Sequence, residues 1–163
     1  MEYINVGKII TTHGLHGEVK IRSSFKYKDK VFVTDNNLYL GEDKKPVTIC
    51  SYRLHQSYDM IVFAEINDID DAIKYKNIDV FINKEMLLLD KNECLNEDLL
   101  GMEVSYQEKS LGVVKRVFDA GFGNEIMEII GKKRVLIPKN EHFIAEIDIK
   151  LRKMTLKNVK GMI

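Results

Sequence analysis

The sequence has few cysteines, no excess of charge of either sign and no long apolar run. Each absence excludes a class of structure or a mode of binding. Of its 163 residues two are cysteines, Cys50 and Cys94, without CxxC or metal-like spacing. We expect reduced thiols rather than a disulfide. No apolar run approaches the roughly 18 residues that a membrane span requires. The first residues lack a basic leader and a hydrophobic stretch, so we expect a cytoplasmic protein that contacts no membrane.

The charge balance argues against one way of binding nucleic acid. The chain has 25 Lys plus Arg and 25 Asp plus Glu, so it cannot coat RNA by bulk positive charge. Local patches remain possible. Lys20 and Arg22 alternate onto one side of a predicted strand, where they could meet phosphate or form a solvated strand face that discourages aggregation.

The pattern of apolar residues predicts a mainly β protein. Short alternating runs such as "GEVKIRS" and "DMIVFAEI" are separated by polar, Gly or Pro residues at intervals of about ten, which is typical of sheet-rich sandwiches and barrels. The exception is "NDIDDAIKYKN", residues 67–77. Asp68 can cap a helix there, Asp70 and Asp71 suit its first turn, and Ile69, Ala72 and Ile73 would share one face. We therefore expect one short helix.

The strand pattern is interrupted by a polar segment, "DKNECLNED", and then starts again. This interruption predicts a domain boundary. We expect one small β domain over residues 1–90, a linker over residues 91–96 and a second small β domain over residues 97–163.

The stretch "THGLHGEVK" contains the densest local motif, with His13 and His16 around Gly14, Leu15 and Gly17. Zinc needs three or four ligands, and no matching cluster accompanies the two histidines, so we expect no metal. Walker and dinucleotide loops open a helix, whereas a strand follows here. The GxxG of a KH domain joins two helices. Two glycines in a strand connection most often adopt positive φ angles in a tight turn.

No catalytic motif accompanies these residues. The chain has no GxSxG sequence and no cysteine and histidine at a recognisable spacing. The acidic segment "DIDDA" could hold magnesium, but carboxylates in the first turn of a helix are favoured by its dipole. We therefore expect no enzyme and no cofactor, and we expect the turn to present contacts to a partner.

The segment "VGKIITTHGLHGEVKI" resembles the N-terminal signature of the RimM family of ribosome maturation factors, through Gly7, Lys8, Gly14, Gly17, Glu18 and Val19. The segment "INDIDDAIKYKNIDVFINKEML" resembles the end of the family's first barrel. "DLLGMEVSYQEKSLGVVKRVFDAGFGNEIMEI", "VLIP" and "IAEIDIKLRKMTL" resemble its PRC-barrel domain. The resemblance implies two tandem β-barrels, an N-terminal translation-factor-like barrel and a C-terminal PRC barrel.

The resemblance also implies a function. It predicts a monomeric, non-enzymatic assembly factor that binds the head of the immature small ribosomal subunit through the ribosomal protein uS19 and nearby rRNA, and so aids 30S maturation and 16S rRNA processing. The alternatives are an RNA-modifying or RNA-cleaving enzyme that uses the barrels to place its substrate, and a free-standing KH-like RNA binder.

The residues expected to bind the partner or RNA form two groups. The first comprises Gly14, Leu15, His16, Gly17, Lys20 and Arg22. The second comprises Cys94, Leu95, Leu99 and Leu100, apolar residues in or beside a polar connector. Cys94 and Leu95 stand where the family usually has two aromatic residues, and Lys139 stands where it tends to have one. The second group either meets a ribosomal protein or packs between the two domains.

Overall fold

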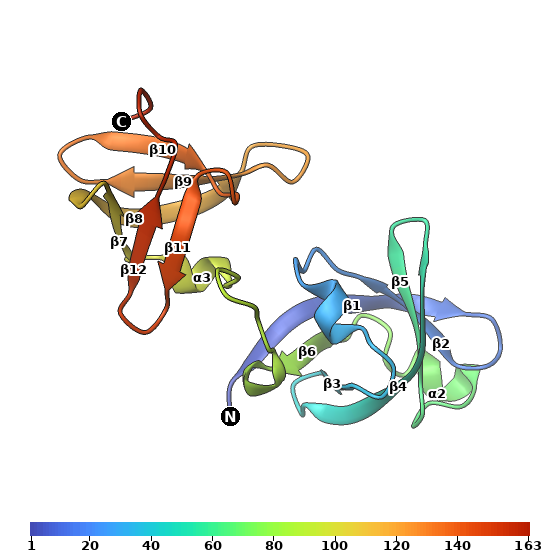
Figure 1. Ribbon diagram of the computed structural model, residues 1–163. Helices are drawn as coiled ribbons and strands as arrows, with labels where there is room; N and C mark the ends of the chain where they lie inside the picture. The colour runs from blue at the N-terminus through green and yellow to red at the C-terminus, as the bar shows by residue number, and fades with distance from the viewer. The chain divides into compact units, whose positions relative to one another are not determined.

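Antiparallel strands make up most of the regular structure in a computed structural model that describes residues 1–163 (Figure 1). The chain divides into two units, Met1–Leu88 and Leu89–Ile163. The prediction of a mainly β protein is confirmed. No helix has both the length and the apolar character needed to cross a membrane.

The first unit is a closed six-stranded barrel with the strand order β1-β2-β5-β4-β3-β6. The ladder of β1 with β6 closes it. Register shifts in the long strands β1 and β4, where they pair with β2 and β5, provide the local bends that a barrel wall needs. The strands are β1 (Tyr3–His13), β2 (Glu18–Arg22), β3 (Asn37–Leu40), β4 (Lys45–His55), β5 (Tyr58–Phe63) and β6 (Asp79–Asn83).

Alternation along the strands builds the barrel core. In β2, Val19 and Ile21 are fully buried while Lys20 is half-buried and Arg22 is exposed. Branched residues from the other strands, such as Ile49 and Ile61, complete the interior. Burying each such side chain stabilises the fold by about 1.5–3 kcal/mol, so the period of two in the sequence determines which face of each strand turns inward.

The predicted helix is present as α2 (Ile69–Ile73). Asp68 caps it, since its side chain accepts a hydrogen bond of 2.9 Å from the backbone N–H of Asp71. Ala72 is buried, but Ile73 is 57% exposed, so the expectation that Ile73 shares the inward face is wrong. Consecutive residues of an α-helix point about 100° apart, so Ile73 turns toward solvent when its neighbour Ala72 faces the barrel.

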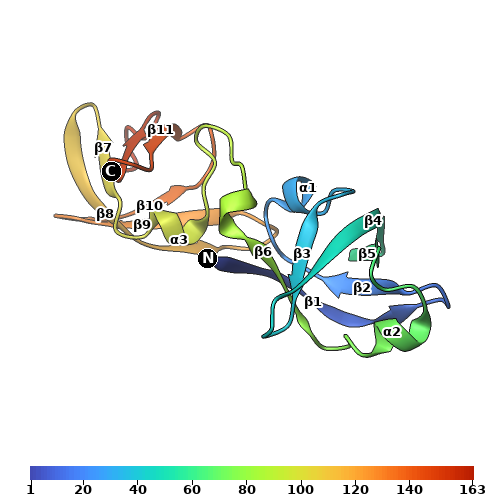
Figure 2. The same ribbon diagram turned by 90° about the horizontal axis from the view of Figure 1, so that it is seen from below.

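The expectation of a single helix is also wrong, because α1 (Lys28–Val31) and α3 (Asn96–Leu99) are helical too, and η1 (Lys84–Met86) is a 3₁₀ turn. Neither α1 nor α3 has a side-chain cap, so their sequences lack the N-cap signal that Asp68 gives for α2. Tyr27, Val31 and Phe32 are buried around α1, and this packing, rather than helix propensity, holds so short a helix. Figure 2 shows α1 and α2 well apart on the barrel.

The second unit is a six-stranded sheet with the order β10-β9-β8-β7-β12-β11. Its β12 and β7 are parallel, and all its other neighbours are antiparallel. The second unit has its own hydrophobic core, which includes Met102, Val104, Met127 and Ile129. The strands are β7 (Glu103–Tyr106), β8 (Lys109–Asp119), β9 (Glu125–Ile130), β10 (Arg134–Pro138), β11 (Ile144–Asp148) and β12 (Lys153–Leu156).

The segment predicted as a linker, residues 91–96, is bound to this second unit. The side-chain oxygen of Asn92 accepts a hydrogen bond of 2.8 Å from the backbone N–H of Ile147 in β11. Cys94 lies in the second core. The tertiary contacts of the second unit therefore begin before α3, and the predicted domain boundaries stay predictions for a proteolysis experiment.

Candidate protein and RNA interface

The glycine turn joins β1 to β2, and both of its glycines have positive φ, +70° for Gly14 and +85° for Gly17. This confirms the predicted backbone geometry. Leu15 is 71% exposed and His16 is exposed between them. The carbonyl of Leu15 accepts a hydrogen bond of 3.2 Å from the backbone N–H of Ile69, at the start of α2. The turn is therefore tethered at its base while its two side chains face solvent.

The two glycines have different structural roles. A Cβ on Gly17 would lie 2.8 Å from the carbonyl oxygen of Ile66 and 3.2 Å from the backbone nitrogen of Asp68, whereas a Cβ on Gly14 would meet nothing within 4 Å. Gly17 therefore permits close packing of the turn against the chain that enters α2. Gly14 supplies only the left-handed backbone conformation.

The hairpin of β4 and β5 contributes to the same surface, which was not expected from the sequence. Arg53 donates two hydrogen bonds to the Glu18 carboxylate, of 3.0 Å and 2.7 Å. The ring centres of His55 and His13 lie 6.3 Å apart. Leu54, between Arg53 and His55, is 65% exposed. The sequence contained one usable signal, since Leu54 is an apolar residue among polar neighbours at the end of a strand.

Charge on this surface is partly compensated. The hydrogen bond from Arg53 holds the pKa of the Glu18 carboxyl below its usual value, against the opposing effect of burial. Glu18 therefore stays ionised and offsets the charge of Arg53. Lys20 places its ammonium 4.1 Å from the centre of the Tyr58 ring, a cation–π contact. Arg22 is exposed at the end of β2, so the predicted basic pair does lie on the outer face.

A buried carboxylate fixes α1 to the barrel. Asp59 in β5 is fully buried, accepts a 2.6 Å hydrogen bond from the Tyr52 hydroxyl and lies 2.9 Å from the Lys28 ammonium. The Phe32 ring stacks on Tyr52 with centres 5.9 Å apart. Burial, then the bond to Asp59, raise the pKa of Tyr52 to about 12. Because Lys28 belongs to α1, this ion pair positions that helix.

The second group of predicted residues divides into buried and surface members. Cys94 and Leu99 are 3% and 0% exposed and belong to the second core, so the expectation that they lie on the surface is wrong. Apolar residues in a polar segment anchor it here to the sheet. Leu100 is 44% exposed and Leu95 is half-buried. These two residues remain available as an apolar surface of the second unit.

Polar contacts hold that surface at both ends of α3. Arg152 donates hydrogen bonds to the carbonyl of Asp98, at 2.6 Å, and to the carbonyl of Leu100. At the other end Lys139 donates to the side-chain oxygen of Asn96 and lies 3.6 Å from the Glu125 carboxylate. The Lys139 side chain is 6% exposed. Lys139, which directly follows β10, thus connects the first residue of α3 to the first residue of β9.

The geometry suits binding, because each surface offers exposed apolar side chains on a backbone held by hydrogen bonds. No group of three or more His, Cys, Asp or Glu is arranged to hold a metal ion.

Comparison with known proteins matches both units. Residues 4–87 match the family model of the RimM N-terminal domain and residues 96–162 that of the RimM PRC barrel domain. Two relatives named "Ribosome maturation factor RimM" come from Exiguobacterium sp. (strain ATCC BAA-1283 / AT1b), 32% identical over 100% of this chain and 98% of its own, and from Exiguobacterium sibiricum, 34% identical over 100% and 99%. A solved structure from Pseudomonas aeruginosa, described as a putative 16S ribosomal RNA processing protein RimM, is 21% identical with a TM-score of 0.49 and covers 96% of this chain and 97% of its own.

Proposed function

The chain belongs to the RimM family, and from this premise we propose that it is a ribosome maturation factor that acts in 16S rRNA processing and assembly of the small ribosomal subunit. The observation that carries the proposal is the match of both family domains, in order, along nearly the whole chain. We propose further that it acts in the cytoplasm, as a monomer and without catalysis.

The finer proposal concerns the partner. We infer that the protein contacts the head of the immature subunit through the ribosomal protein uS19 and nearby rRNA. Two features support this inference. The turn between β1 and β2 presents Leu15 and His16 beside the basic residues of β2. In the second unit, Leu100 and Leu95 offer apolar contact, which a protein partner can cover.

Specific observations argue against the two alternative functions, a KH-like RNA binder and an RNA-modifying or RNA-cleaving enzyme. The GLHG segment joins two strands, β1 and β2, whereas the loop of a KH domain joins two helices. For an RNA-modifying or RNA-cleaving enzyme, a free carboxylate would be a natural acid or base. The two carboxylates with the least exposure, Asp59 and Glu128, are each held by cationic side chains.

Co-sedimentation tests the proposal directly. Leu100→Asp should keep its melting temperature, since the side chain is already 44% exposed, and should lose binding to free small subunits, because a charge at an apolar contact must be desolvated. Leu136→Asp, at a β10 position of 40% exposure, is the matched control and should bind normally.

Two results would contradict the proposal. One is a wild-type protein that sediments with complete ribosomes and not with free small subunits. The other is turnover of isolated RNA by the purified chain, which would favour the enzyme.

A further inference from the structure

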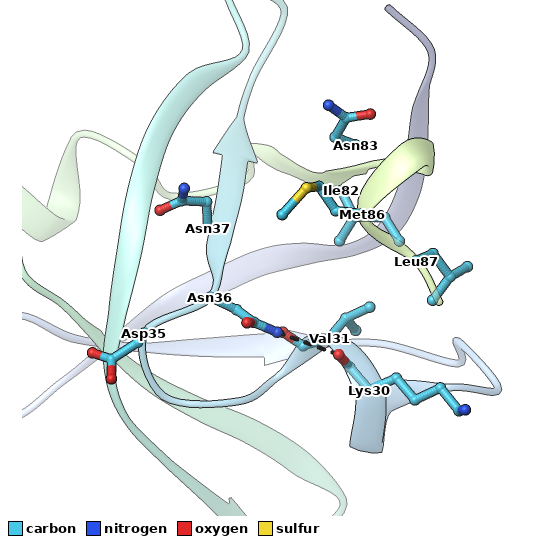
Figure 3. A pocket seen from close by; sticks show the side chains of 9 residues that line it. All are labelled: Lys30, Val31, Asp35, Asn36, Asn37, Ile82, Asn83, Met86 and Leu87. Atoms are coloured by element: carbon cyan, nitrogen blue, oxygen red, sulfur yellow. Dashed lines mark hydrogen bonds between the residues drawn. The ribbon is translucent and has the colours of Figure 1, made fainter. Parts of the chain in front are cut away.

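A small pocket opens in the wall of the first barrel, where the ladder between β3 and β6 ends (Figure 3). These strands pair only at Tyr39 with Phe81 and at Leu40 with Val80. Toward Asn37 and Asn83 they no longer pair, so the barrel wall has a gap at that end. The loop after α1 and the turn η1 form the other sides of the gap.

The pocket has the size of a single flat group. Its volume is about 100 Å³, whereas one water needs roughly 10–15 Å³ in the same measure. Pockets for drug-sized ligands measure roughly 300–1,000 Å³. The space therefore admits one ring or one side chain, and excludes a complete cofactor.

One part of the lining is apolar, and the other part comprises the polar residues Lys30, Asp35, Asn36, Asn37 and Asn83. Val31 and Ile82 belong to the barrel core and form part of the lining, and Leu87 packs against that core. Met86 also lines the pocket and is 71% exposed. A flexible thioether at the entrance can settle on the face of a bound ring.

The polar lining includes two amide nitrogens that have no hydrogen-bond partner within the chain. Asn83 is 6% exposed, and its Oδ1 accepts a 3.0 Å hydrogen bond from the backbone N–H of Glu85. Because a backbone N–H can only donate, this bond fixes the orientation of the amide and leaves Nδ2 on the side away from η1, as Figure 3 shows. On the other strand, Oδ1 of Asn37 accepts from the Thr48 hydroxyl at 3.1 Å, and its Nδ2 is likewise available.

We propose that this pocket binds one unstacked RNA base that offers hydrogen-bond acceptors along one edge, as guanine does with O6 and N7. An apolar protein side chain would fill the space and leave the amide donor of the buried Asn83 unpaired, which is unfavourable. A flat heterocycle places its faces against the apolar walls and its acceptors against Asn37 and Asn83. The inference rests on the proposed contact with rRNA and names a site for it.

The test uses the isolated chain labelled with ¹⁵N and titrated with each of the four nucleoside 5′-monophosphates. We expect guanosine monophosphate to shift the side-chain amide signals of Asn37 and Asn83 at lower concentration than adenosine monophosphate, whose N6 is a donor. Asn37→Asp keeps the acceptor for Thr48 and replaces the donor with a carboxylate, so it should weaken binding by about tenfold or more. Asn83→Asp should do the same.

Asn5→Asp is the matched control. Asn5 also caps a backbone N–H, that of Gly7, through Oδ1 and is exposed outside the pocket, so the change should leave nucleotide binding unaltered. The backbone amide spectrum shows whether each variant is folded, and the exposed position of Asn37 makes its variant the safer one.

Absence of a shift with all four nucleotides would overturn the proposal. So would a shift produced by N-acetylphenylalanine amide and by no nucleotide, because the pocket would then be an anchor for a protein side chain. Failure of co-sedimentation with small subunits, with nucleotide binding intact, would count against the proposed function alone.

Discussion

Replacing each glycine of the β1–β2 turn by alanine separates two effects that the sequence presents as one. Both positions have positive φ, +70° at Gly14 and +85° at Gly17. An L-residue in the left-handed region costs about 1–2 kcal/mol, and we expect Gly14→Ala to lose only that amount. At Gly17 the new Cβ would also lie 2.8 Å from the Ile66 carbonyl oxygen, a backbone atom that cannot rotate away.

Overpacking of that kind costs about 1–3 kcal/mol more, so the total for Gly17→Ala is about 2–5 kcal/mol. The first unit comprises residues Met1–Leu88, and for a domain of that size each kcal/mol lowers the melting temperature by roughly 4–8 °C. Calorimetry of the full chain should therefore show the first-unit transition of Gly17→Ala well below that of Gly14→Ala, with the second-unit transition unmoved. His16→Ala should leave both transitions in place, because that side chain is exposed.

Equal losses of stability in the two glycine variants would refute the reasoning, because the close approach of Ile66 to Gly17 would then make no difference to the free energy of unfolding. A downward shift of the second-unit transition in either variant would also be inconsistent, since the turn lies wholly within the first unit.

Three further predictions test other contacts. A thiol reagent should label the exposed Cys50 quickly and the buried Cys94 only on unfolding; two fast thiols would contradict the placement of Cys94 in the core. Tyr52→Phe should lower stability by about 1–2 kcal/mol, because it removes the hydrogen bond to buried Asp59. The folded pKa of Tyr52 is raised from 10.0 to about 12, so this stabilisation is complete below pH 10 and is lost toward pH 12; urea unfolding across that range should show the difference between wild type and variant disappear. Limited trypsin digestion should cut after Lys91 and release two folded fragments, whereas a core resistant across that point would contradict the proposed linker.

Several features followed from the sequence because they depend on local periodicity and local chemistry. Val19 and Ile21 alternate with charged residues, and their inward position needs only the geometry of a strand. Asp68 caps α2 because a carboxylate next to a free N–H is favoured wherever a helix begins. The positive φ of Gly14 and Gly17 likewise expresses a preference of the residue itself.

Other features depended on which distant segments meet. Cys94 and Leu99 looked like surface residues in a polar connector, yet they enter the second core, and no local pattern distinguishes an anchor from a docking surface. Arg53 pairs with Glu18, 35 positions away, because β2 and β4 both flank β5.

The sequence by itself determined the strands, their inward faces, the glycine turn and the family, since each is encoded in the order of neighbouring residues. Only the tertiary structure decided what becomes of side chains whose surroundings come from elsewhere in the chain. The pocket between Asn37 and Asn83 shows the reason: it exists because two strands distant in sequence pair for only part of their length, and no property of either strand alone predicts where such a ladder ends.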